Sequence, residues 1–336
     1  MHFFSTPTFL AAAQAADPEL AGARPTDVRV RGHGRYRVLG TTKGRLFPSL
    51  PFVDYLVALD DSDPSVESTA DVRHLDNVVL DELTVDEFAR HQRNDGLEAT
   101  DPILTDGQGG RRTVSPYVEW HSFSSFEEYI TRARSSSKRA FRETRRKVSL
   151  VERELGIQPT FTYDDPDPGR FEQCLRWKAQ QYLTTGNSDL IAAGAGTLMR
   201  ELRDADQLVI STLCAGDRLL AAHIGFVDNN VFHYWLPAYD DTAAKAAPGV
   251  RLLELMLAAS FERNHAAFDF LEGQEAYKFS YATHVRVVGT IGTPSLALAT
   301  VRRSRRRIGI EIRRRPRVER TIERIRNVAA RHLLRR

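Results

Sequence analysis

The pattern of apolar and polar positions predicts short strands separated by turns over the first 120 residues. Alternating apolar positions indicate strands at residues 27–30, 36–40, 52–59, 74–80 and 113–120. A short helix is expected at residues 85–93. Thr6 followed by Pro7 is typical of a helix start, since threonine caps the first turn and proline suits its first position.

Residues 124–156 predict one long amphipathic helix. Apolar and small residues recur at a spacing of three to four from Ile130 to Leu155, and the other faces are rich in Arg and Lys. Ser124 or Ser125 is expected to cap its start, and the following glycine, Gly156, to end it. A helix of this length fits a connector between two domains.

The pattern after this helix mixes helices and strands. Helices are expected at residues 170–184, 189–204 and 250–262, and strands at 157–163, 208–214, 219–227, 230–237, 266–271 and 285–291. Gly216-Asp217 and Asn229-Asn230 are typical of tight hairpins, so the three central strands should be antiparallel. We therefore expect an α/β (α+β) chain whose mixed, largely antiparallel sheets are flanked by helices.

The composition is that of an ordinary packed protein. A chain of 336 residues with 42% hydrophobic residues suffices for two domains and argues against global disorder. Cys174 and Cys214 are too few for a disulfide framework and lack metal-ligand spacing, which favours a reducing, cytoplasmic setting. The N-terminus lacks the basic start of a signal peptide. The sequence also contains no run of about 18–20 apolar residues, the length that a membrane-spanning helix needs.

Charge is unevenly distributed along the chain. Residues 301–336 hold 15 arginines and three acids, a net charge of +12, which leaves −9 for the other 300 residues of a chain whose total is +3. We expect residues 297–336 to form an Arg-rich helical tail that binds an anionic membrane surface, tRNA or an acidic partner. The alternative is a solvated helix packed against the acidic body.

The start of the helix near residue 250 is a candidate anion site. Pro248 suits the first helical position, and Gly249 has no side chain to obstruct a ligand. Free amide groups at a helix N-terminus attract a pyrophosphate, and Lys245 and Arg251 would add positive charge. The alternative is that Pro-Gly simply marks where a helix begins.

The stretch from His233 to Phe279 resembles the CelD-like branch of the GNAT superfamily, with its BioF2-like acetyltransferase domain. It is more distantly similar to Fem-type peptidyltransferases, which contain two such domains in tandem. The resemblance covers about residues 139–286 and rests on Ala221-Ala222-His223, Gly216-Asp217, Ala238-Tyr239-Asp240, Pro248-Gly249, Phe268-Asp269-Phe270, Gly273, Glu275 and Tyr277-Lys278.

The resemblance implies an N-acyltransferase that uses acetyl-CoA or another acyl-CoA and a small-molecule amine acceptor. CelD-like proteins occur with polysaccharide synthesis clusters, so the acceptor implied is an amino sugar of polysaccharide or cell-envelope biosynthesis. The donor site implied comprises Leu236, Ala238, Tyr239, Lys245, Pro248, Gly249, Val250 and Arg251. It also implies two GNAT-like domains, at residues 1–123 and 157–296, joined by the helix at 124–156.

One departure from the superfamily leaves the function open. The usual pyrophosphate loop with several glycines is absent, and only Pro248-Gly249 stands in its place. Fem-type relatives use aminoacyl-tRNA instead of acyl-CoA. Two alternatives therefore remain, a Fem-type aminoacyl-tRNA-dependent transferase and a non-catalytic GNAT-fold binding protein.

Acyl transfer to an amine needs a proton acceptor, a group that holds the oxyanion and a group that stabilises the leaving thiolate. The candidate catalytic residues are His223, Asp269, Glu275, Tyr277 and Lys278. His223 is either a proton relay or a satisfied core histidine, and Asp269 is either catalytic or a structural acid bonded to backbone or Lys278. Glu275 follows a strand end, where loops gather substrate. Tyr277 either supplies a phenolic proton or an oxyanion contact, or simply packs in the core. The scattered histidines predict no metal site.

Overall fold

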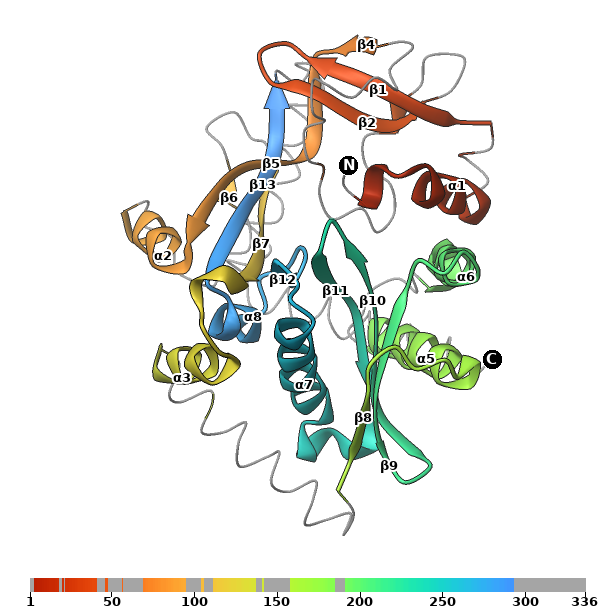
Figure 1. The fold of residues 1–336 in the computed structure, drawn as a ribbon. Coiled ribbons are helices and arrows are strands. Elements are labelled where there is room, and N and C mark those ends of the chain that lie inside the picture. The colour runs from red at the N-terminus through yellow and green to blue at the C-terminus, as the bar shows by residue number, and fades with distance from the viewer. Residues whose placement is uncertain are drawn as a thin grey trace, which may run out of the picture.

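The chain folds around two mixed β-sheets flanked by helices (Figure 1). A computed structural model describes residues 3–17, 20, 22–40, 46–47, 56, 69–94, 104–105, 111–136, 141, 158–184 and 191–292. The predicted tail at 297–336, most of the connecting helix and the expected strand at 52–59, apart from one residue, lie outside the described residues.

The strands form one sheet of four strands and one of nine. The first has the order β3-β2-β1-β4, and the second β5-β13-β7-β12-β11-β10-β9-β8, with β6 paired to β7. The strands are β1 (Arg24–Val30), β2 (Gly34–Gly40), β3 (Leu46–Phe47), β4 (Thr69–Val72), β5 (His74–Thr84), β6 (Leu104–Thr105), β7 (Arg111–Glu119), β8 (Thr160–Thr162), β9 (Val209–Ala215), β10 (Arg218–Asp228), β11 (Val231–Tyr239), β12 (Ala267–Asp269) and β13 (His284–Gly292). Only β1–β4 and β11–β12 are parallel among these described strands.

Helices cover the nine-stranded sheet. They are η1 (Phe3–Ser5), α1 (Pro7–Ala16), α2 (Val85–Asn94), η3 (Trp120–Ser122), α3 (Phe126–Ser136), α5 (Pro168–Thr184), η4 (Ile191–Ala195), α6 (Gly196–Asp204), η5 (Asp241–Ala246), α7 (Pro248–Glu262) and α8 (Ala276–Tyr281). The prediction of a mixed α/β fold with largely antiparallel sheets and flanking helices is confirmed.

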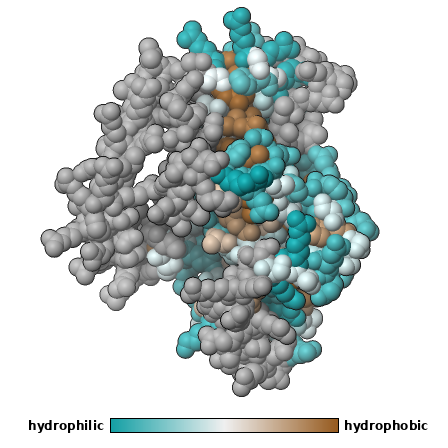
Figure 2. All heavy atoms as spheres, turned by 90° about the vertical axis from the view of Figure 1, so that its left-hand side faces the viewer, coloured by the Kyte–Doolittle hydropathy of each residue, from teal (hydrophilic) through white to brown (hydrophobic). Residues whose placement is uncertain are grey.

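The two faces of the central strands carry different cores. Alternate residues of a strand point to opposite faces, so Ala222 packs with α5 and α6 while its neighbour Ala221 packs with α7 and α3. The α5 side also receives α1, which places the N-terminal helix against α6 (Figure 1). On the side shown in Figure 2, hydrophobic residues form a vertical band between hydrophilic groups.

Short-range signals in the sequence define several element ends. Thr6 caps α1 by accepting a hydrogen bond from the Phe9 amide, and Pro7 opens the helix as predicted. At α3, the Ser125 hydroxyl accepts the Glu128 amide while Glu128 accepts from the Ser124 amide and hydroxyl. This reciprocal arrangement is a capping box, so both serines that the sequence indicated take part in the helix start.

The hairpins are also as predicted. Asn229 and Asn230 both adopt positive φ, 47° and 61°, as the two central residues of a tight hairpin turn require. The strand expected at 266–271 is shorter, because Leu271 at φ 57° reverses the chain after β12. The strand expected at 157–163 is limited to Thr160–Thr162.

The long sheet continues across the boundary proposed between the two halves of the chain. β5 and β7 precede the connecting segment in sequence, yet β13 pairs with both of them, and β12 pairs with β7. Strands from both proposed halves therefore share one sheet. The division into tandem GNAT-like domains stays a prediction.

Candidate functional site

The parallel strands β11 and β12 pair over only three residues. Their pairing runs from Val231 opposite Ala267 to His233 opposite Asp269. β11 then continues to Tyr239, whereas β12 ends. In open α/β sheets, ligands bind in the crevice outside the carboxyl ends of the strands. The region beyond these two strand ends is therefore the candidate site.

A β-bulge lies in β11 at this point. Tyr234 and Trp235 together face the single residue Gly225 of β10. The Trp235 amide donates to Nε2 of His223 at 3.0 Å instead of to the neighbouring strand. A side chain at Gly225 would overlap the His223 ring and the His233 carbonyl, so the bulge requires glycine here.

His223 is held as a neutral imidazole. Because Nε2 accepts a hydrogen bond, the ring proton must lie on Nδ1, which has no hydrogen-bond partner among the described residues. Burial, with a smaller effect of the Lys178 charge, lowers the His223 pKa well below its usual value. The ring stacks on Tyr234 with centroids 4.3 Å apart. This geometry favours the alternative of a structural histidine over a proton relay.

The N-terminus of α7 offers fewer free amides than the sequence suggested. Ala247 adopts the left-handed conformation at φ 50°, and its carbonyl accepts the amides of Val250 and Arg251 at 3.1 and 3.2 Å. Pro248 has no amide hydrogen. Among the described residues, the Gly249 amide alone of this first turn has no acceptor. The expected anion site is thus reduced to one amide and the helix dipole.

The other residues of the implied donor site differ in accessibility. Tyr239 is 36% exposed, and its ring lies against Gly249, where an added Cβ would come within 3.2 Å of Cδ1. Leu236 and Ala238 are buried in the core, so they would meet a ligand through their backbone only. Lys245 is exposed on η5. The structure therefore brings Tyr239 and Gly249 together at the end of β11.

α8 brings Glu275 and Lys278 together. The Lys278 Nζ lies 3.1 Å from Glu275 Oε2 and donates to the Glu272 carbonyl at 3.0 Å. The Lys278 side chain is 7% exposed and that of Glu275 56%. Gly273 has φ 154°, and a side chain there would overlap both partners, so glycine is required beside the pair. Burial raises the pKa of Tyr277, which therefore remains a protonated phenol.

Two hydrogen bonds anchor the C-terminal end of α8. The Tyr129 hydroxyl, from α3, donates to the Tyr281 carbonyl at 2.9 Å. The Tyr281 hydroxyl in turn bonds Glu254 of α7 at 3.0 Å. α8 is thereby fixed between two helices, which holds Glu275 and Lys278 in place.

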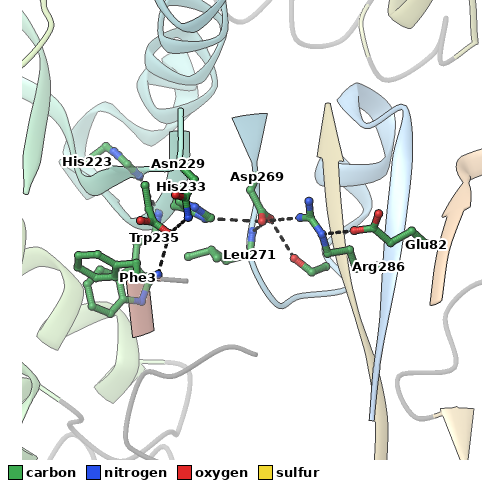
Figure 3. Close-up of polar contacts among 11 residues, drawn as sticks. Phe3, Glu82, His223, Asn229, His233, Trp235, Asp269, Leu271 and Arg286 are labelled. Atoms are coloured by element: carbon green, nitrogen blue, oxygen red, sulfur yellow. Dashed lines mark hydrogen bonds and ion pairs between the residues drawn. The ribbon is translucent and has the colours of Figure 1, made fainter. Parts of the chain in front are cut away.

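Asp269 is the centre of a second, buried cluster. Its Oδ1 accepts from the Ser115 hydroxyl at 3.0 Å and the Leu271 amide at 2.8 Å. Its Oδ2 accepts from Arg286 at 2.6 Å and lies 3.6 Å from Nδ1 of His233 (Figure 3). Both oxygens are therefore bound by protein groups.

These contacts favour a structural role for Asp269. A fully buried carboxylate needs such partners, and the backbone partner that the sequence indicated is the Leu271 amide. Lys278, the other expected partner, bonds Glu275 and the Glu272 carbonyl. Arg286 continues the chain of charges to Glu82 at 2.6 Å (Figure 3).

Sequence reasoning missed Lys178. It is half-buried on α5, and its Nζ donates to the Pro237 carbonyl at 3.1 Å. Pro237 lies on the part of β11 beyond its pairing with β12. Burial lowers the Lys178 pKa, Cys174 and Glu275 raise it, and Lys278 lowers it. A signal was present, because Lys178 follows the buried Cys174 by one helical turn and is one of only six lysines in an arginine-rich chain.

Arg286 was missed as well. It stands between Val285 and Val287 in an apolar strand, opposite Ser115 of β7. A charged residue in such a strand needs a buried partner of opposite charge. That rule indicates an acid nearby, but the identity of the acid depends on strand order.

The described residues contain no group of three or more His, Cys, Asp and Glu side chains placed to hold a metal ion. Among the same residues, no helix is long and apolar enough to cross a lipid bilayer.

Residues 136–279 match the family described as Acetyltransferase (GNAT) domain. No curated protein matches the chain by sequence. The resemblance to the GNAT superfamily that the residues around α7 and α8 indicated is confirmed, and the match spans both the α7 start and the Glu275–Lys278 pair.

Several solved structures align with most of the chain at low identity. FemX aligns with 86% of this chain and 92% of its own, at 10% identity and a TM-score of 0.48. L-PGS from Bacillus licheniformis aligns with 92% of this chain and 98% of its own, at 13% identity and a TM-score of 0.44. The C-terminal domain (DUF2156) of a putative lysylphosphatidylglycerol synthetase from Agrobacterium fabrum aligns at 11% identity, a TM-score of 0.44, and 88% and 92% of the two chains.

Proposed function

Because residues 136–279 match the family described as Acetyltransferase (GNAT) domain, we propose that the chain is an N-acyltransferase. It would move an acyl group, in the simplest case an acetyl group, from acyl-CoA to a small-molecule amine. The observation that carries this proposal is that β12 ends at Asp269 while β11 continues to Tyr239, whose ring lies against Gly249 at the start of α7. An extended acyl donor fits along a strand edge whose neighbour has ended.

The donor would bind at the end of β11 and the start of α7. The free Gly249 amide and the helix dipole attract a phosphate, and Arg251 and the exposed Lys245 supply charge nearby. Tyr239 lies against Gly249 and would form a wall of this site. Gly249 leaves the phosphate room to approach the backbone.

The acceptor would bind at α8. The buried Lys278 ammonium can hold the oxyanion that forms when the amine attacks the carbonyl. Tyr277, kept protonated by burial, can give its proton to the leaving thiolate. Glu275 is half-exposed and orients Lys278. An amino sugar of polysaccharide or cell-envelope biosynthesis is the acceptor class that the family resemblance supports.

A second candidate function is transfer from aminoacyl-tRNA. The observation that favours it is the α7 start, where one free amide replaces the row of amides that a coenzyme A pyrophosphate would use. The +12 charge of residues 301–336 suits a nucleic acid backbone equally well as an anionic membrane or acidic partner.

The acyl-transfer assay uses the full chain with acetyl-CoA and a panel of amines that includes amino sugars. Release of free thiol with an acetylated amine in the mass spectrum supports the proposal. A parallel reaction with aminoacyl-tRNA separates the second candidate. A folded protein that releases thiol with none of the amines and transfers no acyl group contradicts N-acyl transfer from coenzyme A.

A further inference from the structure

The half-buried Lys178 lies beside the Glu275–Lys278 pair of α8. Glu275 and Lys278 both act on Lys178 electrostatically, and Lys178 bonds the Pro237 carbonyl at 3.1 Å. Two lysines therefore share the neighbourhood of one carboxylate, at the strand segment where the donor is proposed to bind. Cys174, the other titratable group nearby on α5, is fully buried, and burial raises its pKa to about 12.

The other candidate proton acceptors already have partners. Nε2 of His223 accepts the Trp235 amide. Both oxygens of Asp269 accept hydrogen bonds from protein groups. Glu275 is paired with Lys278 at 3.1 Å. Lys178 differs from these groups, because its hydrogen bond to Pro237 uses an N–H and leaves the lone pair of the neutral amine available.

We propose that Lys178 accepts the proton of the amine substrate, an inference that rests on the acyl transfer proposed above. The substrate ammonium gives one proton to the neutral Lys178 amine. The freed amine attacks the thioester carbonyl, forming a C–N bond and an oxyanion. The C–S bond then breaks, the thiolate takes the proton of Tyr277, Tyr277 regains a proton from the attacking nitrogen, and Lys178 releases its proton to solvent. The products are an amide, free thiol and one proton.

The surroundings of Lys178 favour the neutral amine that this role requires. Burial is the largest effect that lowers its pKa, and Lys278 lowers it further, against Cys174 and Glu275, which raise it. His223 is neutral, and the Tyr182 ring lies 5.4 Å from Nζ. Because the neutral amine is the active form, kcat/KM should rise with pH through the Lys178 pKa.

The Lys178→Arg variant separates a base from a fixed positive charge. Arginine keeps the charge but is not deprotonated in this range. We expect kcat/KM at pH 8 to fall by about 100-fold or more, with unchanged affinity for acetyl-CoA. Arg176→Met, on an exposed position of the same helix, is the matched control and should keep wild-type activity.

A second variant keeps the proposal testable if arginine distorts the site. Lys178→Cys followed by aminoethylation restores an amine of similar length and lower basicity. The native cysteines are buried, and burial raises the pKa of each, so they should react slowly. We expect activity to return. The rise of kcat/KM with pH should occur at lower pH than in the wild type.

The outcomes distinguish the two proposals. A wild-type protein that transfers no acyl group from acetyl-CoA removes the proposed function, and the role of Lys178 with it. An active wild type whose Lys178→Arg variant keeps full kcat/KM, or whose aminoethylated variant shows an unmoved pH profile, overturns the role of Lys178 alone.

Discussion

Two groups of charged residues in this molecule are built differently. The closed cluster consists of Asp269, Arg286, Ser115 and His233, and its central carboxylate is 0% exposed with both oxygens bonded. The open cluster consists of Lys178, Glu275 and Lys278, and its carboxylate is 56% exposed. Each contains residues that the sequence suggested as catalytic, namely Asp269 in the closed cluster and Glu275 and Lys278 in the open one.

The difference separates structural from chemical roles. In the closed cluster each charge is neutralised by a fixed partner, so a substrate would have to break a buried ion pair to react. In the open cluster two lysines face a single carboxylate that reaches solvent, so the site can exchange protons and bind new groups. We therefore assign stability to the closed cluster and chemistry to the open one.

The largest effect is expected on removing a charge from the closed cluster. Arg286→Met leaves the buried Asp269 carboxylate without its cation and should lower the free energy of unfolding by about 3–5 kcal/mol. Urea denaturation measures this. Arg218→Met is the control, since its ion pair with Asp240 is on the surface and should be worth less than about 1 kcal/mol. Equal losses in both variants would remove the distinction.

The second largest effect is expected from acid, which should lower the free energy of unfolding through the closed cluster. Burial lowers the His233 pKa to about 4, against a usual value of 6.5. The unfolded chain then binds the proton first, so the stability that neutral His233 gives is full above about pH 7 and is lost as the pH falls towards 4. Between pH 7 and pH 5, the free energy of unfolding should fall by an amount on the order of 2 kcal/mol.

Denaturation curves at pH 7 and pH 5 check this effect. His233→Asn should flatten the pH dependence, whereas His121→Asn, at a side chain that is 73% exposed, should leave it as in the wild type. A pH slope that survives in His233→Asn would assign the acid sensitivity elsewhere.

A smaller effect is expected at the proposed donor site. Gly249→Asp puts a side chain and a negative charge where a phosphate would bind, so affinity for acetyl-CoA should fall more than tenfold, or about 1.4 kcal/mol. Gly216→Asp adds the same charge at the β9–β10 hairpin, where the space is open, and should keep the affinity. Calorimetry on both variants decides, and unchanged affinity in folded Gly249→Asp would refute the donor site.

The smallest change in stability is expected at Glu275. Glu275→Gln loses a half-exposed ion pair, so the free energy of unfolding should change by less than about 1 kcal/mol. Turnover should nevertheless fall, because Glu275 orients Lys278. The rise of kcat/KM with pH should also move to lower pH, because Glu275 raises the pKa of Lys178. Full activity at every pH would exclude Glu275 from the mechanism.

The sequence predicted features that depend on neighbouring residues. The cap at Thr6, the serine cap of α3 and the Asn229-Asn230 hairpin are set by residues within one turn of each other. The Glu275–Lys278 pair also lies within one helical turn, although the sequence indicated Asp269 as a partner of Lys278. Such contacts follow from spacing along the chain.

Contacts that depend on strand order could not be predicted. Asp269 meets Arg286 only because β12 and β13 both pair with β7. Lys178 reaches Pro237 because α5 packs on β11, and His223 bonds the Trp235 amide because a bulge shifts the register. None of these distances is fixed by the local pattern, so the two clusters became distinct only in the folded chain.

The central claim is that an acyl-CoA binds where β11 continues beyond the end of β12, and it is tested most directly by titrating the full chain with acetyl-CoA in a calorimeter. We expect saturable binding to one site in the wild type and binding more than tenfold weaker in Gly249→Asp. Absence of any heat with acetyl-CoA, under conditions where the same protein binds aminoacyl-tRNA, would contradict it.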